Sequence, residues 1–328
     1  MRNLRFHNRI IIWLCFALSI FTADIAAASS PSVLTVDYTE RNPLSLVVKK
    51  YRWLEREFRA DHLQIHWLYT PGSDVALSYL TSGALHVASC AALPSLCFRA
   101  NGYPIRSVYV FTRADWAAIV VHRDSRINSL QELSGKRIAV EMGTDPYFFL
   151  IRALHEVHLQ KSDVMIVPVQ HVQGRTLMER GCVDAWAGRS PFLEMSQLEC
   201  GSRVLYRNAL LSTPGFLNVS EDFARRYPKA VSRVVKVYEK ARLWALRHPD
   251  DFDNIYAEEA RLSVQIARLV LSRYDFSDPV FTSNDIWQLK RAVPVLSEEK
   301  LIRQDADMDQ VIDDLIDYRF VSGKRGSD

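Results

Sequence analysis

From residue 33 onward, short apolar runs alternate with segments in which apolar residues recur at helical spacing. The short runs are typical of buried strands and lie at 33–38, 63–69, 86–89 and 106–112. Helical spacing follows at 44–58, in a segment that ends at Gly83, and in one that ends near Gly102. Strands that alternate with helices predict βαβ units and a mostly parallel sheet.

A second series of the same kind begins after residues 113–116. The run 117–122 is almost continuous with the strand before it, which indicates a crossing from one lobe to another. Further strands are expected at 137–142, 163–169 and 183–187, with helices between them and after Pro191. The segment 215–219 returns as a strand, and Ser220 caps the helix that follows.

The rest of the chain is predicted to be helical, including 229–248, 263–274, 283–293 and 307–318. We therefore predict a discontinuous lobe 1 (29–113 and 215–328) and a lobe 2 (114–214). Two connections between two lobes make a hinge. Because ligands of open α/β sheets bind outside the carboxyl ends of the strands, the facing lobes would share one cleft.

The first residues predict export from the cytoplasm. Three arginines precede an apolar run at 10–21, and Ala26 to Ala28 offer an A-x-A cleavage site, so we expect a signal peptide that is cleaved near Ala28. The apolar run is shorter than the roughly 20 residues that a membrane span needs. We therefore expect a soluble periplasmic protein.

The balance of charge excludes a nucleic-acid-binding surface. The chain has 41 basic and 38 acidic residues, and removal of residues 1–28 lowers the formal charge from +3 to +1. These charges are scattered rather than clustered. Four cysteines remain after maturation; an oxidising compartment permits disulfides between them, although a chain of this size does not need any. The sequence leaves the state of Cys90, Cys97, Cys182 and Cys200 open.

The stretch 135–146 is the first candidate ligand site. It predicts a buried strand, a turn at Gly143, and a helix that Thr144 or Asp145 caps and Pro146 begins. The N–H groups at such a helix start and the positive end of its dipole suit an anionic group. Gly143 and Thr144 are therefore predicted to hold a ligand's head group.

Other candidates follow the ends of predicted strands or the lobe crossing. Arginine offers a forked, permanently charged partner to an acid group, and an aromatic ring can enclose an apolar tail. The candidate contacts are Tyr38, Arg41, Ser89, Cys90, Trp116, Trp186 and Arg189. Each also has an ordinary structural interpretation as a turn, core or hinge residue.

Several motifs together resemble the periplasmic binding proteins of ABC importers in the aliphatic sulfonate, taurine and nitrate group. The resemblance lies in Asp124-Ser125-Arg126-Ile127, in Leu130 to Val140 with its Ser134-Gly135-Lys136 core, in Gly143-Thr144, and in Gly181-Cys182-Val183-Asp184-Ala185-Trp186. It covers nearly the whole mature chain. It implies an α/β type II periplasmic binding protein fold that closes its two lobes on a small solute and delivers that solute to a membrane permease.

The chain departs from that family's pattern at two places. Arg189 and Ser190 stand where the resemblance implies a tryptophan and an aspartate, and the acid Asp145 follows the glycine–hydroxyl pair. Arg189 suits a sulfonate or carboxylate, whereas Asp145 opposes an anion unless it pairs elsewhere. The sequence leaves open whether these two residues pair with each other or with a ligand.

We therefore expect a monomeric, non-enzymatic solute receptor for a small anionic solute, with no cofactor or metal. No nucleophile elbow, phosphate loop or dinucleotide motif supports catalysis. One alternative is a thiamin-pyrimidine-like or other heteroaromatic ligand, from whose ring amine Asp145 would accept a hydrogen bond. Another is a periplasmic sensor partner with the same fold.

Overall fold

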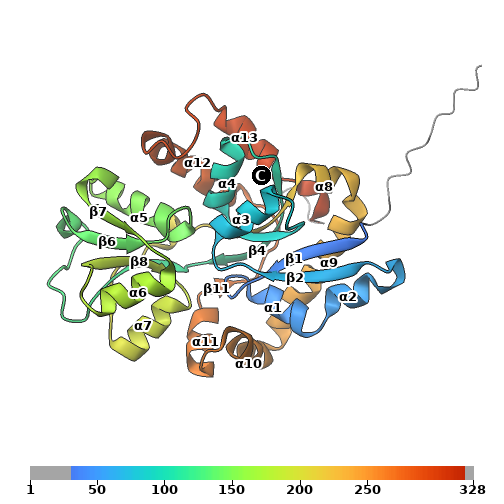
Figure 1. Ribbon diagram of the computed structural model, residues 1–328, viewed down its shortest axis with the longest axis horizontal. Coiled ribbons are helices and arrows are strands. Elements are labelled where there is room, and N and C mark those ends of the chain that lie inside the picture. Colours follow the sequence, from blue (N-terminus) through green and yellow to red (C-terminus); the bar gives the residue numbers. More distant parts are fainter. Residues whose placement is uncertain (1–30, 322–328) are drawn as a thin grey trace, which may run out of the picture.

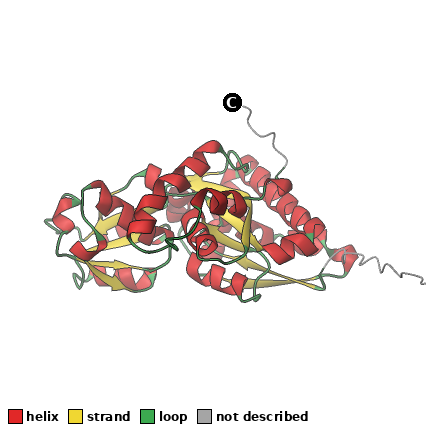
Figure 2. Cartoon of the chain, turned by 90° about the horizontal axis from the view of Figure 1, so that it is seen from above, coloured by secondary structure: helices red, strands yellow, loops and turns green. Residues whose placement is uncertain are grey.

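The computed structural model describes residues 31–321 and shows two lobes, each built of β-strands with helices packed on them (Figure 1). The view from above separates the two lobes along the long axis of the molecule (Figure 2). The predicted signal peptide and its cleavage site at Ala28 lie outside the described residues. Among those residues, no helix has both the length and the apolar character that a membrane crossing requires.

Lobe 1 contains two sheets that a bridge connects. β1 (Val33–Tyr38) pairs in parallel with β2 (Gln64–Tyr69). The second sheet has the order β11-β4-β10-β3, with β3 (Ala88–Ala91), β4 (Ile105–Ala114), β10 (Gly215–Ser220) and β11 (Tyr274–Asp275). A parallel bridge between Val36 and Val87 links β1 to the start of β3.

Lobe 2 is built on one five-stranded sheet. Its order is β7-β6-β8-β5-β9. The strands are β5 (Ala117–Val121), β6 (Arg137–Val140), β7 (Met165–Pro168), β8 (Ala185–Arg189) and β9 (Arg203–Tyr206).

The sheets are mixed, so the prediction of a mostly parallel sheet is wrong. β10 runs antiparallel to β3 and β4, and β5 runs antiparallel to β8 and β9. β11 also runs antiparallel to β4. The directions of β10 and β5 follow from the crossings between the lobes. β5 follows β4 almost directly, and β10 brings the chain back to lobe 1. Neither β5 nor β10 therefore follows a crossover helix that would make it parallel to its neighbours.

Helices cover the sheets and fill the C-terminal part of the chain (Figure 1). Those of the first half are α1 (Pro43–Lys50), α2 (Trp53–Glu57), α3 (Ser73–Thr81), α4 (Ala92–Ala100), α5 (Asp145–Glu156) and α6 (His171–Glu179). Those of the second half are α7 (Phe192–Cys200), α8 (Glu221–Arg226), α9 (Pro228–Arg247), α10 (Pro249–Ala260), α11 (Val264–Leu271), α12 (Ser283–Glu298) and α13 (Met308–Leu315).

The helix expected at 44–58 is two helices. Arg52 lies between α1 and α2 with a φ of 53°, a left-handed conformation that a continuous helix excludes. Asn42 caps α1 by accepting a hydrogen bond from the Ser45 N–H at 3.3 Å. Asn42 also donates to the Ser89 hydroxyl at 2.9 Å, which ties the start of α1 to β3.

Trp186 belongs to the core of lobe 2. It is fully buried beneath the sheet with Val120, Met178 and Leu193. Gly188 lies so close to it that a Cβ there would come within 2.3 Å of the indole ring. The ring therefore packs flat against the backbone of its own strand.

Candidate functional site

A small cavity lies between the lobes at the carboxyl ends of their strands. From lobe 1 it is lined by the turn after β1, the end of β3 and the start of α3: Arg41, Ala91, Gly72 and Ser73. From the crossing and lobe 2 it is lined by Trp116, Thr144, Asp145, Pro146, His171 and Arg189. The space open to the centre of a water molecule is about 10 Å³, roughly room for one water.

Arg41 is a buried cation that lacks a carboxylate partner. It is 5% exposed, and Nη1 donates to the Ser73 hydroxyl at 3.0 Å, while Nη2 reaches Thr70 at 3.5 Å. Within residues 31–321 it forms no ion pair, and its Nε has no hydrogen-bond partner. Burying a charge in this way is costly unless something else compensates it.

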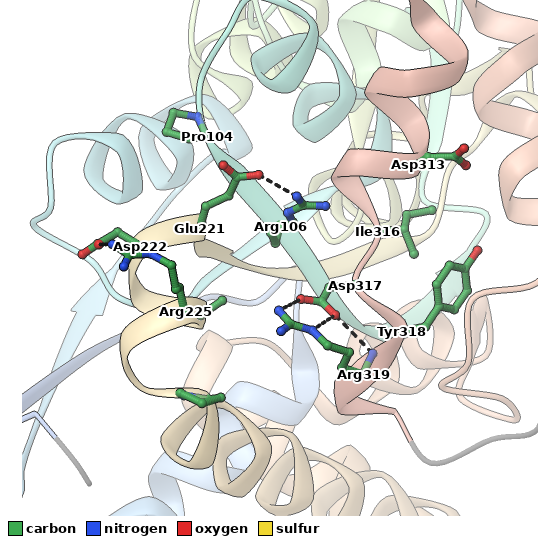
Figure 3. Close-up of a pocket in the computed structure, with 12 residues that line it drawn as sticks. Pro104, Arg106, Glu221, Asp222, Arg225, Asp313, Ile316, Asp317, Tyr318 and Arg319 are labelled. Carbon is green, nitrogen blue, oxygen red and sulfur yellow. Dashed lines mark hydrogen bonds and ion pairs between the residues drawn. The ribbon is translucent and has the colours of Figure 1, made fainter. Parts of the chain in front are cut away.

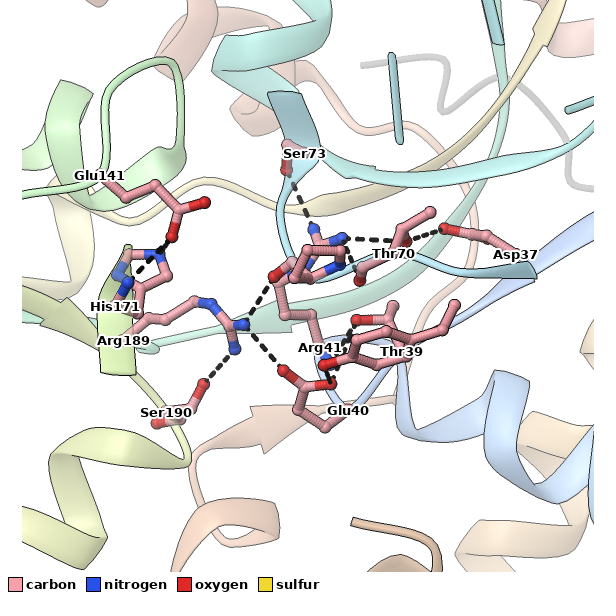
Figure 4. A network of polar contacts seen from close by, with 12 residues as sticks. Asp37, Thr39, Glu40, Arg41, Thr70, Ser73, Glu141, His171, Arg189 and Ser190 are labelled. Atoms are coloured by element: carbon pink, nitrogen blue, oxygen red, sulfur yellow. Dashed lines mark hydrogen bonds and ion pairs between the residues drawn. The ribbon is translucent and has the colours of Figure 1, made fainter. Parts of the chain in front are cut away.

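The Thr70 hydroxyl that Arg41 reaches donates in turn to the Asp37 carboxylate at 2.9 Å (Figure 4). Asp37 also accepts hydrogen bonds from the backbone and hydroxyl of Ser89. Burial nevertheless raises the pKa of Asp37, because it outweighs these hydrogen bonds and the charge of Arg41. Asp37 is therefore linked to Arg41 only through the Thr70 hydroxyl and does not pair with its charge directly.

Arg189 pairs across the cleft with a residue that the sequence reasoning missed. Its Nη2 donates to Glu40 Oε1 at 2.8 Å and to the Pro71 carbonyl at 2.8 Å, both on lobe 1 (Figure 4). Burial raises the pKa of Glu40, but the charge and hydrogen bond of Arg189 outweigh it, so that pKa is lowered overall. The two lobes are thus joined by a buried ion pair, and Arg189 Nε is left without a partner.

His171 adds a neutral imidazole to the same cavity. Burial and the positive charges of Arg189 and Arg41 lower its pKa well below the ordinary value. Neither ring nitrogen makes a hydrogen bond, although Nε2 lies 3.3 Å from Glu141 Oε2. A neutral imidazole carries one N–H, so His171 supplies a further donor that has no partner.

Asp145 does not pair with Arg189. Its carboxylate accepts from the Trp116 indole at 2.7 Å and from the Thr213 hydroxyl at 2.6 Å. Burial raises the pKa of Asp145 to about 6 against these two hydrogen bonds. Asp145 therefore ties the start of α5 to both connections between the lobes.

The turn before α5 is close to the prediction. Thr144 is the cap residue, Asp145 is the first helical residue, and Pro146 is the second. The Thr144 hydroxyl donates to the Glu141 carbonyl at 2.7 Å rather than capping the helix. Thr144 lines the cavity, whereas Gly143, with a φ of 73°, is half-buried and is not among the residues that line it.

Four other predicted residues do not line this cavity. Ser89 is buried and donates to Asp37, the Cys90 thiol is buried behind Ala91, and Trp186 is a core residue. Tyr38 is half-buried and lines a neighbouring pocket instead. All four described cysteines are free thiols.

Five predicted residues therefore line the cavity together: Arg41, Trp116, Thr144, Asp145 and Arg189. The sequence reasoning missed Ser73, His171 and Glu40. Glu40 lies between the strand expected at 33–38 and the helix expected at 44–58, at the end of a predicted strand, which was a usable signal. Nothing in the sequence around His171 distinguishes it from a surface histidine.

A larger open groove of about 1080 Å³ lies in lobe 1 among α8, β4 and the end of α13 (Figure 3). Most of its charged side chains pair with one another; Arg106 lies 2.8 Å from Glu221, and Arg319 lies 2.6 Å from Asp317. None of the buried unpartnered polar atoms in residues 31–321 belongs to a side chain that lines it. The interlobe cavity is therefore the better candidate despite its small volume.

Comparisons with known proteins agree with the two-lobed architecture. A family model described as NMT1/THI5 like matches residues 58–252. A Bacillus subtilis protein named "Putative aliphatic sulfonates-binding protein" is 25% identical over 271 residues, which are 82% of each chain. The alkanesulfonate-binding protein SsuA of Xanthomonas axonopodis, solved bound to MOPS, has a TM-score of 0.80 and 21% identity over 89% of this chain and all of its own.

The same fold also occurs in a desulfurization enzyme, DszB. That structure has a TM-score of 0.64 and 17% identity, and the match covers 88% of this chain and 97% of the enzyme. The predicted periplasmic binding protein fold is therefore confirmed, and the fold by itself is compatible with both binding and catalysis.

Proposed function

Because the chain belongs to the NMT1/THI5-like family, we propose that it is the periplasmic solute-binding component of an ABC importer. Its solute is a small organic acid of the aliphatic sulfonate or taurine type. The relatives named for sulfonate binding support this class of ligand. The basic start, apolar run and A-x-A site of residues 1–28 support export.

One observation carries the choice of an anion. Three side chains of the cavity, Arg41, Arg189 and His171, are buried and have nitrogens that lack a hydrogen-bond partner. A buried donor without a partner costs about 1–3 kcal/mol, and more when it is charged. An acid group placed among these nitrogens would satisfy them and neutralise Arg41.

The cavity as it stands is too small for such a solute. About 10 Å³ accommodates one water, so the lobes must separate, or Glu40 must leave Arg189, before an acid group enters. We infer that the ligand's acid group then takes the place of the Glu40 carboxylate at Arg189. Trp116 and Thr144 would contact the remainder of a small solute.

The protein acts without catalysis and as a monomer in this proposal, and it delivers its solute to a permease. Asp145, whose chemistry would be the most suitable for proton transfer, has both oxygens engaged by Trp116 and Thr213. Turnover of a tightly bound ligand would contradict the non-enzymatic part. Binding by a dimer alone would contradict the monomer.

One observation favours a second ligand class, a heteroaromatic amine of the thiamin-pyrimidine type. Glu141 Oε1 and Asp74 Oδ1 are buried acceptors without partners, and both lie beside Gly72 at the cavity. Burial and the neighbouring Asp74 raise the pKa of Glu141. A ring amine would satisfy these oxygens, whereas a simple anion would not.

A thermal-shift screen of residues 29–328 separates the two classes. Ethanesulfonate, taurine, acetate, nitrate and an aminopyrimidine are compared at equal concentrations, because stabilisation grows as RT ln(1 + [L]/Kd). We expect the sulfonates to raise Tm. Stabilisation by the aminopyrimidine alone would reject the anion proposal, and Arg189→Ala should abolish the sulfonate response.

A further inference from the structure

A second pocket lies on the other side of the Arg189–Glu40 ion pair. It offers about 460 Å³ to the centre of a water molecule and is lined from both lobes. Most of its lining is aromatic or aliphatic: Tyr38, Leu46, Tyr69, Phe192, Met195, Ala260 and Leu262. We refer to it as the aromatic pocket.

The ion pair is the wall between this pocket and the small cavity. Glu40 lines the aromatic pocket, Arg189 lines the small cavity, and 2.8 Å separates Glu40 Oε1 from Arg189 Nη2. The Arg189 guanidinium also lies over the Phe192 ring, 5.2 Å from its centroid. One cation therefore belongs to the small cavity and touches the lining of the aromatic pocket.

A second side chain, Tyr69, hydrogen-bonds to this ion pair. Tyr69, which is 47% exposed, donates its hydroxyl to Glu40 Oε2 at 3.0 Å, and its ring lies 5.6 Å from that of Tyr38. Glu40 is thus held on the pocket side by an exposed residue. Rotation of Glu40 away from Arg189 would join the two spaces and leave the guanidinium facing an aromatic lining.

We propose that the aromatic pocket holds the organic body of the solute, so that the protein prefers an aromatic or long-chain sulfonate over a short one such as taurine. This inference rests on the proposed function, because the acid group stays at Arg41 and Arg189. The small cavity has room for about one water, so it cannot hold the organic body together with the acid group. The body must therefore lie elsewhere, and the aromatic pocket is the adjoining space with matching chemistry.

The test compares two probes by calorimetric titration of residues 29–328. Ethanesulfonate supplies the acid group with a short body, and naphthalene-2-sulfonate supplies the same group with an aromatic one. Transfer of a ring into an apolar lining should tighten binding of the second probe by about tenfold or more. Equal affinities for the two probes would overturn the inference and leave the proposed function standing.

Two variants test whether the preference for naphthalene-2-sulfonate arises in the aromatic pocket. Tyr38→Ala removes a half-buried ring from the pocket lining, and Ala260→Phe fills the pocket without removing any packed group. Both should weaken naphthalene-2-sulfonate about fivefold or more while changing ethanesulfonate little. Tyr79→Ala is the matched control, because that tyrosine is 36% exposed and lines neither space.

The outcomes separate the two claims. An unchanged preference in Ala260→Phe would show that the body binds elsewhere and would overturn the inference. Failure of both sulfonates to bind the wild-type protein would instead overturn the proposed function, and with it the inference.

Discussion

Replacement of Glu40 by glutamine tests whether an internal carboxylate occupies the ligand's place. In the structure Glu40 accepts from Arg189 at 2.8 Å and from Tyr69 at 3.0 Å, and it is 8% exposed. Glutamine keeps the shape and can still accept one hydrogen bond. It removes the charge that neutralises Arg189, so an incoming acid group no longer competes with a resident one.

The magnitude follows from the burial of the pair. Loss of one member of a buried ion pair costs about 3–5 kcal/mol, and separation of the lobes lets Arg189 regain water, so the unliganded variant should be destabilised by at most that amount. A hydrogen bond to a charged group contributes about 1.5–3 kcal/mol. The Glu40→Gln variant should therefore bind a sulfonate about 10- to 100-fold more tightly.

Calorimetric titration with ethanesulfonate and chemical denaturation measure the two effects separately. Asp285→Asn is the matched control, since Asp285 is fully buried and lies 2.6 Å from Arg113 within lobe 1. That variant should lose stability without a change in affinity. Weaker sulfonate binding by Glu40→Gln would refute the reasoning, because it would make Glu40 part of the ligand's support and not its competitor.

Three further predictions follow from the site and the core. Arg41→Met should lower sulfonate affinity at least 100-fold, because charge-assisted hydrogen bonds are lost, while the unliganded protein loses little stability; a large loss of stability with retained affinity would make Arg41 structural. Asp145→Asn tests how the stability of the protein depends on pH. The folded-state pKa is raised from 3.8 to about 6, so the contribution of Asp145 is present below about pH 4 and lost as the pH rises through 6, a change of about 3 kcal/mol. As the pH rises through that window, the unfolding free energy of the variant in denaturation curves should therefore increase relative to that of wild type. The gain is reduced by about 1 kcal/mol for the hydrogen bond that an amide cannot accept. A difference that does not change with pH would contradict the raised pKa. Gly188→Ala places a Cβ within 2.3 Å of the Trp186 ring and should cost about 1–3 kcal/mol of unfolding free energy with sulfonate affinity unchanged; altered affinity would restore Trp186 as a ligand contact.

Local patterns were sufficient for most of the framework. The predicted strands at 33–38, 183–187 and 215–219 overlap β1, β8 and β10, because apolar runs bounded by turn residues carry that information in the sequence itself. The resemblance to sulfonate-type binding proteins and the two-lobed fold are confirmed. Two elements, β9 and β11, depend on pairing with β5 and β4 and have only weak local patterns. α10 lies in the part of the chain that is predicted to be helical, and Pro249 with the acidic residues after it marks where this helix begins.

Site residues were predictable where their position at the end of a strand places them in the cleft. Arg41, Thr144 and Arg189 each follow or end a strand whose carboxyl end faces the cleft, and all three line the cavity. Glu40 and His171 take their importance from partners 149 and 30 positions away in the sequence. The Glu40–Arg189 pairing arises from the facing of the two lobes and the His171–Glu141 pairing from packing within lobe 2, and no local pattern encodes either.

The most direct test of the account is a crystal structure of residues 29–328 grown with ethanesulfonate. The account predicts sulfonate oxygens within about 3 Å of Arg41 Nε and of the Arg189 guanidinium, with Glu40 rotated away from Arg189. An intact Arg189–Glu40 ion pair, with the sulfonate bound outside the interlobe cleft, would contradict it.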